Sequence, residues 1–254
     1  MSLNNKLVEF RKKIRTNRKH VVDSIIEDHS VNMCVFCGEV NDLTREHVIP
    51  QWVYERCTSR TFITTTNNNA QSNNKTTVPA CRDCNNNILG ELERHLKHKF
   101  KATDLRHEYF SDDDIDKIIL WLETIEYKFH VLDLRRNLNR VQGSDYIPYI
   151  GKIPIAMFQG PVDQSPSKVF SNLRNALKTL SVKSKNSRHN SLCIIRTTNP
   201  DFNFFHSTNN YIFIELAQYN AAFFYFYKQE FVSASEATAQ AQRIVKNEYK
   251  STRA

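Results

Sequence analysis

Four cysteines are arranged in two pairs with a spacing typical of metal sites. Cys34 and Cys37 form the sequence CVFC, and Cys81 and Cys84 form CRDC. A two-residue spacer makes a tight turn that points both sulfur atoms of a pair at one ion, and four thiolates satisfy tetrahedral zinc without leaving a position for water. The spacing therefore predicts a structural Zn²⁺ site, which would stabilise a segment with little core of its own.

The alternatives for these pairs are unliganded thiols and redox-active CxxC motifs. Cys57 and Cys193 have no such partner, and we expect both to be buried thiols. No run approaches the ~20 apolar residues of a membrane span, and the first residues lack the apolar stretch of a signal peptide. We therefore expect a cytoplasmic protein with no membrane partner, in which cysteines serve as thiols and metal ligands.

Two short motifs accompany the cysteine pairs. The sequence LTREHVIPQW lies between them, and CNNNILGELE begins at the last cysteine. Together they resemble the HNH, or ββα-metal, endonucleases, particularly prokaryotic members with a CxxC pair, an EHVxP segment and a second CxxC followed by Asn-Asn. The resemblance covers about residues 34 to 93. It implies a β-hairpin that carries the histidine, a helix after the second pair, and one divalent ion between them.

The resemblance assigns a role to three residues. Glu46 matches the acidic metal ligand, His47 the general base and Asn85 the final ligand. Neutral imidazole can take a proton from water at neutral pH, and hard oxygen ligands suit Mg²⁺ or Mn²⁺. The implied activity is hydrolysis of phosphodiester bonds in DNA that leaves a 5′ phosphate, with a context in restriction or anti-phage defence.

Each assignment has a plain structural alternative. His47 could be an ordinary core or surface histidine, and Asn85 could simply cap the helix that follows. Neighbours on a regular strand point to opposite faces, so Glu46 and His47 can both reach one site only where the strand ends or bends. Pro50 favours a strand end nearby.

The chain departs from the family pattern at two places. Some members carry a second histidine one turn beyond the final ligand, but here that residue is Leu89, which cannot coordinate a metal. The middle Asn of the pattern has no clear match, because Asn73 and Asn74 are present but Thr76 is nearer the expected place. Glu93, about 12 Å along the helix from Asn85, is expected to position structure and not metal.

Basic residues suggest where phosphates would bind. The chain of 254 residues has 35 Lys and Arg against 27 Asp and Glu, a formal charge of +8. This suits a nucleic-acid partner, although solubility explains it equally well. Arg82, Arg94 and Lys97 lie on or beside the predicted catalytic helix, where cations would meet phosphates flanking a cleavage site.

The pattern of apolar residues predicts an α+β protein with three parts. These are an N-terminal helical segment (1–30), an HNH module (31–100) and an α+β accessory or recognition domain (101–254). Helices are expected from about 111 to 129, 166 to 180 and near 233 to 249, with antiparallel strands within 191–227. Residues 64–77, rich in Asn and Thr, are expected to form an exposed loop.

Three functional readings remain open from the sequence. The first is the HNH endonuclease acting on DNA. The second is a zinc-stapled module that binds nucleic acid or protein without cutting, and the third is a nuclease directed at RNA. The C-terminal domain is expected to recognise the target, to form a homo-oligomer or to bind an activating partner.

Overall fold

The computed structural model describes residues 1–28, 30–55, 61–63, 70–72, 76–104, 108–140, 166–200 and 202–251. Internal contacts divide the chain into two compact units whose segments alternate along the sequence. The first, here called the cysteine unit, comprises Met1–Val48, Thr77–Glu91 and Thr124–Val182. The second, here called the sheet unit, comprises Ile49–Thr76, Leu92–Glu123 and Lys183–Ala254.

The cysteine unit begins with one long helix, α1 (Leu3–Glu27). The side chain of Ser2 caps it by accepting a hydrogen bond from the backbone N–H of Asn5. Residues spaced three, four or seven apart form its buried stripe, which includes Phe10, Ile14 and Val21. The helical segment expected at the N-terminus is confirmed, as a single helix.

A two-stranded hairpin and the π-helix after it follow in the same unit, whereas the next helix belongs to the sheet unit from Leu92 onward. Strand β1 (Leu43–His47) pairs antiparallel with β4 (Thr77–Cys81), with Leu43 opposite Cys81 and His47 opposite Thr77. The chain then enters a π-helix, η3 (Asp83–Leu89), which continues as α2 (Gly90–Ala102). π-Helices are rare and occur frequently at functional sites. The π-helix directly after β4 therefore makes this junction of strand and helix a candidate functional site.

Two further helices contribute to the cysteine unit. Helix α3 (Asp112–Arg140) starts where Ser111 accepts a hydrogen bond from the backbone of Asp114, as its Ser-Asp beginning predicts. Its residues from Thr124 onward belong to the cysteine unit. Helix α4 (Pro166–Leu180) packs against α1. Both helices were expected from their apolar periodicity.

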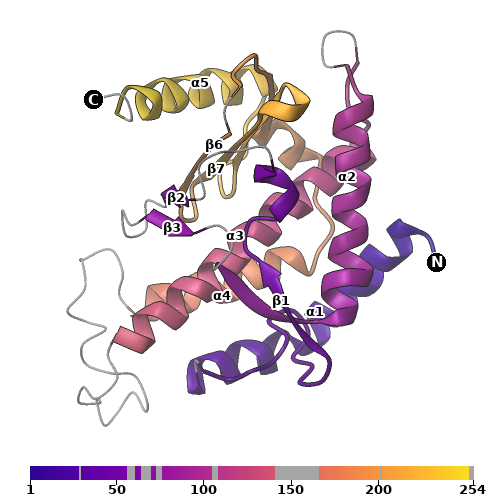
Figure 1. Ribbon diagram of the computed structural model, residues 1–254, viewed down its shortest axis with the longest axis vertical. Helices are drawn as coiled ribbons and strands as arrows, with labels where there is room; N and C mark the ends of the chain where they lie inside the picture. Colours follow the sequence, from indigo (N-terminus) through magenta and orange to yellow (C-terminus); the bar gives the residue numbers. More distant parts are fainter. Residues whose placement is uncertain are drawn as a thin grey trace. The chain divides into compact units, whose positions relative to one another are not determined.

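The sheet unit is built on four antiparallel strands in the order β5-β8-β7-β6. Their bounds are Leu192–Arg196 for β5, Asn203–Ser207 for β6, Tyr211–Leu216 for β7 and Ala221–Phe226 for β8. Helix α5 (Ala234–Ser251) lies along this sheet in Figure 1, and its Ala237 and Ala241 pack against Phe213 and Phe224. The predicted antiparallel strands and final helix are confirmed, and the aromatic run of β8 is core.

Short elements complete the sheet unit. They are the 3₁₀ turns η1 (Gln51–Tyr54), η5 (Asn186–Ser191) and η6 (Ala217–Tyr219), and the antiparallel pair β2 (Thr61–Ile63) and β3 (Ala70–Ser72). Strand β3 corrects the expectation of a loop throughout 64–77, because backbone pairing with β2 overrides its polar composition. Cys57, Asn73 and Asn74 lie outside the described residues.

The architecture is mixed helix and antiparallel sheet, as the α+β prediction required. Within the described part of the chain, none of the helices combines the length and the apolar character that crossing a membrane demands.

Candidate functional site

The four predicted zinc ligands come together at one point of the cysteine unit. The sulfur atoms of Cys34, Cys37, Cys81 and Cys84 all lie within 4.8 Å of one another. The Sγ atom of Cys37 is 3.7 Å from that of Cys81 and 3.7 Å from that of Cys84. Tetrahedral zinc with bonds of about 2.3 Å requires sulfur separations of about 3.8 Å. The cluster therefore fits Zn²⁺ in number, ligand type and spacing.

A tight turn shapes the first cysteine pair. The backbone N–H of Gly38 donates to the carbonyl of Cys34, and the N–H of Cys34 donates to the carbonyl of Glu39 at 2.7 Å. Gly38 has φ +78°, and an added Cβ would lie 2.9 Å from the His20 ring. Glycine is therefore required at this turn both by its left-handed backbone and by its close approach to α1.

The second pair is positioned by the change from strand to helix. Cys81 ends β4, and its sulfur accepts a hydrogen bond from the backbone N–H of Cys84 in η3 at 3.5 Å. Hydrogen bonding to the sulfurs of Cys34, Cys37 and Cys81, with a smaller contribution from burial, raises the pKa of Cys84 well above its usual value. Four adjacent thiolates are thus disfavoured without a cation, whereas bound zinc would displace the protons.

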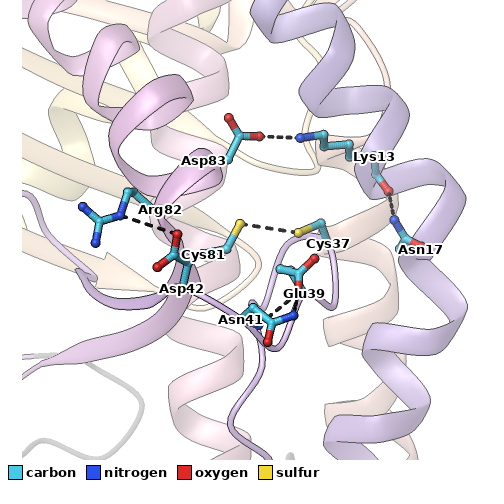
Figure 2. Close-up of a pocket in the computed structure, with 9 residues that line it drawn as sticks. All are labelled: Lys13, Asn17, Cys37, Glu39, Asn41, Asp42, Cys81, Arg82 and Asp83. Carbon is cyan, nitrogen blue, oxygen red and sulfur yellow. Dashed lines mark hydrogen bonds and ion pairs between the residues drawn. The ribbon is translucent and has the colours of Figure 1, made fainter.

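A pocket of about 450 Å³ lies beside the cysteine cluster. Figure 2 shows the residues that line it, among them Cys37 and Cys81. Its charged groups pair with one another: Lys13 with Asp83, and Arg82 with Asp42 at 3.9 Å. The hydrogen bond from Lys13 holds the pKa of Asp83 below its usual value. Glu39, the remaining charged residue of the lining, accepts hydrogen bonds from the backbone of Val40 and Asn41. The charged groups of the pocket are thus bonded to one another or to the backbone, and we assign them to the support of the cysteine cluster.

Glu46 is buried in the hairpin and forms an ion pair. Its side chain is 9% exposed, and Oε1 accepts a hydrogen bond at 2.7 Å from the ammonium of Lys128, which is 1% exposed. The same ammonium donates to the backbone carbonyl of His47 at 2.6 Å. One cation from α3 therefore holds two consecutive residues at the end of β1.

His47 occupies the strand end that the sequence predicted. It is the last residue of β1, is half-buried, and precedes a bend at Val48 and Ile49. The register stays regular through Glu46 opposite Val78 and His47 opposite Thr77. Glu46 is accordingly buried and its two neighbours more exposed, as strand alternation requires.

Asn85 lies inside η3 and contacts β1. Its amide Nδ2 donates to the Thr44 hydroxyl at 2.8 Å, and that hydroxyl donates to the carbonyl of Ala80 at 2.9 Å. Arg82 is the residue at the helix N-cap position, so the capping alternative for Asn85 is wrong. Thr44 and Glu46 are two residues apart on β1, so their side chains share a face of the strand. Because the Asn85 amide nitrogen donates to Thr44, its amide oxygen is the atom suited to a hard cation.

The predicted phosphate contacts are exposed residues near the chain's second cysteine pair and on α2. Arg82, in the cysteine unit, is exposed despite its distant pairing with Asp42. Arg94 and Lys97 are exposed on α2, where Lys97 pairs with Glu55 at 3.4 Å. Such surface pairs contribute little, typically below about 1 kcal/mol, and phosphates can displace them.

Other charged residues of α2 support the sheet unit. The indole of Trp52 donates to Glu93 at 3.2 Å, in keeping with the structural role expected of that carboxylate. His95 contacts Asp114 at 2.8 Å, and Lys99 contacts the same carboxylate at 3.1 Å. Hydrogen bonds from His95, Ser111 and Lys99 outweigh burial and lower the pKa of Asp114.

Lys128 is the residue of this site that sequence reasoning missed. It lies in the run YKFHVL of α3, and its side chain meets Glu46 from 82 positions away. A lone lysine within an apolar helical stretch was the available signal. Its neighbour Tyr127 also reaches the cysteine unit's core, where the hydroxyl donates to the Val35 carbonyl at 2.5 Å.

Replacing Lys128 by methionine should destabilise the fold by about 3–5 kcal/mol, because Glu46 would be left as a buried charge without a partner. Chemical denaturation of the zinc-loaded protein measures the loss. The double variant Lys128→Met/Glu46→Gln should recover most of it, since both charges are then absent. Equal destabilisation in the single and double variants would contradict the importance of the ion pair.

The described residues thus join the cysteine cluster to a hairpin that carries Thr44, Glu46 and His47, with Asn85 bonded to the first of these. Comparisons of this chain with protein-family models, with curated proteins and with solved structures found no match.

Proposed function

We propose that this protein is a metal-dependent endonuclease of the HNH type that hydrolyses phosphodiester bonds in DNA. The observation that carries the proposal is the junction of hairpin and helix. The four-cysteine cluster joins the first cysteine turn to the end of β4, and η3 follows directly with Asn85 bonded to Thr44 of β1. A base candidate and two oxygen donors therefore belong to segments that are fixed against one another.

The proposed chemistry assigns one task to each residue. The imidazole of His47 takes a proton from the attacking water. Glu46 and Asn85 offer a carboxylate and an amide oxygen, the ligand types that Mg²⁺ and Mn²⁺ prefer. A divalent ion held there would stabilise negative charge on the scissile phosphate and on the departing 3′ oxygen. Cleavage of this kind leaves a 5′ phosphate.

The donor set suits a weakly held ion. Mg²⁺ commonly binds through one or two carboxylates, several waters and the phosphates of the substrate. Glu46 supplies one carboxylate, of which Oε1 is engaged by Lys128, so Oε2 is the oxygen proposed as ligand. These residues therefore fit an ion that takes some of its ligands from the protein and the others from the nucleic acid and water.

A second function is favoured by the same ion pair. Because Lys128 already neutralises Glu46, the chain could be a zinc-stapled module that binds nucleic acid without cutting it. The Glu46 carboxylate, paired with Lys128, would then contribute only to the stability of the fold. Restriction or anti-phage defence is a context proposed from the resemblance, for either function.

Incubation with supercoiled plasmid and with a structured RNA in Mg²⁺ or Mn²⁺ distinguishes these functions. We expect nicking of DNA that EDTA abolishes and that yields ligatable 5′-phosphate ends. Cleavage of the RNA alone would redirect the proposal to RNA. Retarded migration of the plasmid without any cleavage, in both ions, would favour the binding module.

Removal of the three predicted phosphate contacts should weaken DNA binding uniformly across sequences. For Arg82→Ala/Arg94→Ala/Lys97→Ala, we expect the slope of log affinity against log salt to become shallower by roughly 2–3, because each phosphate contact contributes about 0.9. Fluorescence anisotropy of a labelled duplex over a salt series measures this slope.

The control variant removes the same charge from other exposed positions, through Arg174→Ala/Lys178→Ala on α4 and Lys246→Ala on α5. Its slope should stay near that of the wild type. If both variants change the slope equally, net charge alone accounts for binding and the assigned contacts are wrong.

A further inference from the structure

The strongest unexplained feature of the site is a lysine buried where a metal ligand is proposed. The Lys128 side chain is 1% exposed, and its ammonium binds Oε1 of Glu46 at 2.7 Å and the His47 carbonyl at 2.6 Å. Burying an ammonium is costly unless it is paired and hydrogen-bonded. Both conditions are met by two residues at the end of β1, so the pairing is specific to this site.

The pairing fixes the net charge of the proposed ion site. The Glu46 carboxylate contributes −1 and the Lys128 ammonium +1, while the Asn85 amide is neutral. A cation that bound Oε2 of Glu46 would share one carboxylate with the ammonium, and the two positive charges would repel each other. Little surrounding water screens this repulsion, because both side chains are almost fully buried.

We infer that Lys128 makes the free protein a poor binder of divalent ions, so that the ion is retained only together with nucleic acid. The inference rests on the proposed function and adds to it the order in which the site assembles. A phosphate of the substrate supplies the negative charge that Lys128 has cancelled. Ion and nucleic acid therefore increase each other's affinity by the same factor, as linkage requires.

Lys128 acts here as a positioning residue. Its bond to the His47 carbonyl holds the strand end, and its bond to Oε1 leaves Oε2 of Glu46 for the ion. An ion pair that served stability alone would give a different result, since Mn²⁺ affinity would then not depend on the charge at position 128.

The test measures Mn²⁺ binding to the zinc-loaded full-length protein at pH 8 without nucleic acid, from the loss of the electron paramagnetic resonance signal of free Mn²⁺. We expect millimolar binding for the wild type and for Lys128→Arg. Lys128→Met should bind at least tenfold more tightly, and Lys128→Met/Glu46→Gln should return to weak binding. Equal affinity of Lys128→Met and the wild type would overturn the inference.

A second measurement keeps the test decisive if Lys128→Met does not fold. Wild-type protein is titrated with Mn²⁺ in the presence of a non-cleavable phosphorothioate duplex, with the duplex alone and the Glu46→Gln complex as controls. At least tenfold tighter binding in the wild-type complex only is expected, and no gain over the controls overturns the inference. If Mn²⁺ and the duplex bind cooperatively but ordinary plasmid DNA is not cleaved, the proposed hydrolysis is refuted while this inference stands.

Discussion

His47→Ala should lower the rate of plasmid nicking by about 10³-fold while leaving DNA affinity unchanged. General-base catalysis by a positioned side chain typically contributes 10²–10⁴-fold, and no other described residue at the end of β1 offers an imidazole. Initial rates at saturating Mg²⁺ measure the loss, and anisotropy with a labelled duplex checks binding.

The matched control is His98→Ala, which removes an exposed histidine from α2. Its rate should stay within about twofold of the wild type. His47→Gly adds a sharper check, because free imidazole should restore part of its activity if the ring acts as a base. Undiminished nicking by His47→Ala would show that a contaminant or another residue cleaves the DNA.

Removal of zinc should have the largest effect on stability. Structural zinc sites contribute on the order of 10 kcal/mol to folding, comparable with the entire stability of many domains. Loss of even about 5 kcal/mol through Cys84→Ser would lower the melting temperature by roughly 10–20 °C. Calorimetry of this variant, and of wild-type protein treated with a chelator, measures the change.

Elemental analysis accompanies the calorimetry. We expect about one zinc ion per wild-type chain and far less in Cys84→Ser. The control is Cys193→Ala, since Cys193 is also buried but lies in β5 of the sheet unit, where burial raises the pKa of its thiol. That variant should keep its zinc and lose only about 1 kcal/mol. A zinc-free wild type with unchanged stability would refute the structural site.

Elements set by local pattern could be predicted from the sequence. Helix α4 buries one apolar stripe at the period of a helix, and α3 could be predicted from the same spacing of its apolar residues although it is buried on nearly all sides. Strands β5, β7 and β8 could be predicted because they are rich in β-branched and aromatic residues, and β7 and β8 are buried on both faces. The short strand β3 could not be predicted in this way, because it pairs with β2 through the backbone and its polar side chains give no pattern typical of a strand.

The candidate site likewise has features that local sequence predicts and features that depend on packing. CxxC spacing predicts that the two sulfurs of a turn can bind one ion. Pro50 favoured a strand end nearby, and β1 ends at His47. The widened helix around Asn85, and its bond to Thr44 instead of a capping role, depend on how η3 meets the hairpin. No local propensity favours a π-helix at that position.

By itself the sequence determined the α+β class and the residues and spacing of the cysteine cluster, and it supplied the residues that we propose as base and oxygen donors. Only the tertiary structure decided that a lysine 82 positions away neutralises Glu46 and holds the His47 carbonyl. The physical reason is that spacing along the chain governs which neighbours share a turn or a face, whereas the charge balance of a buried site depends on every element that packs against it.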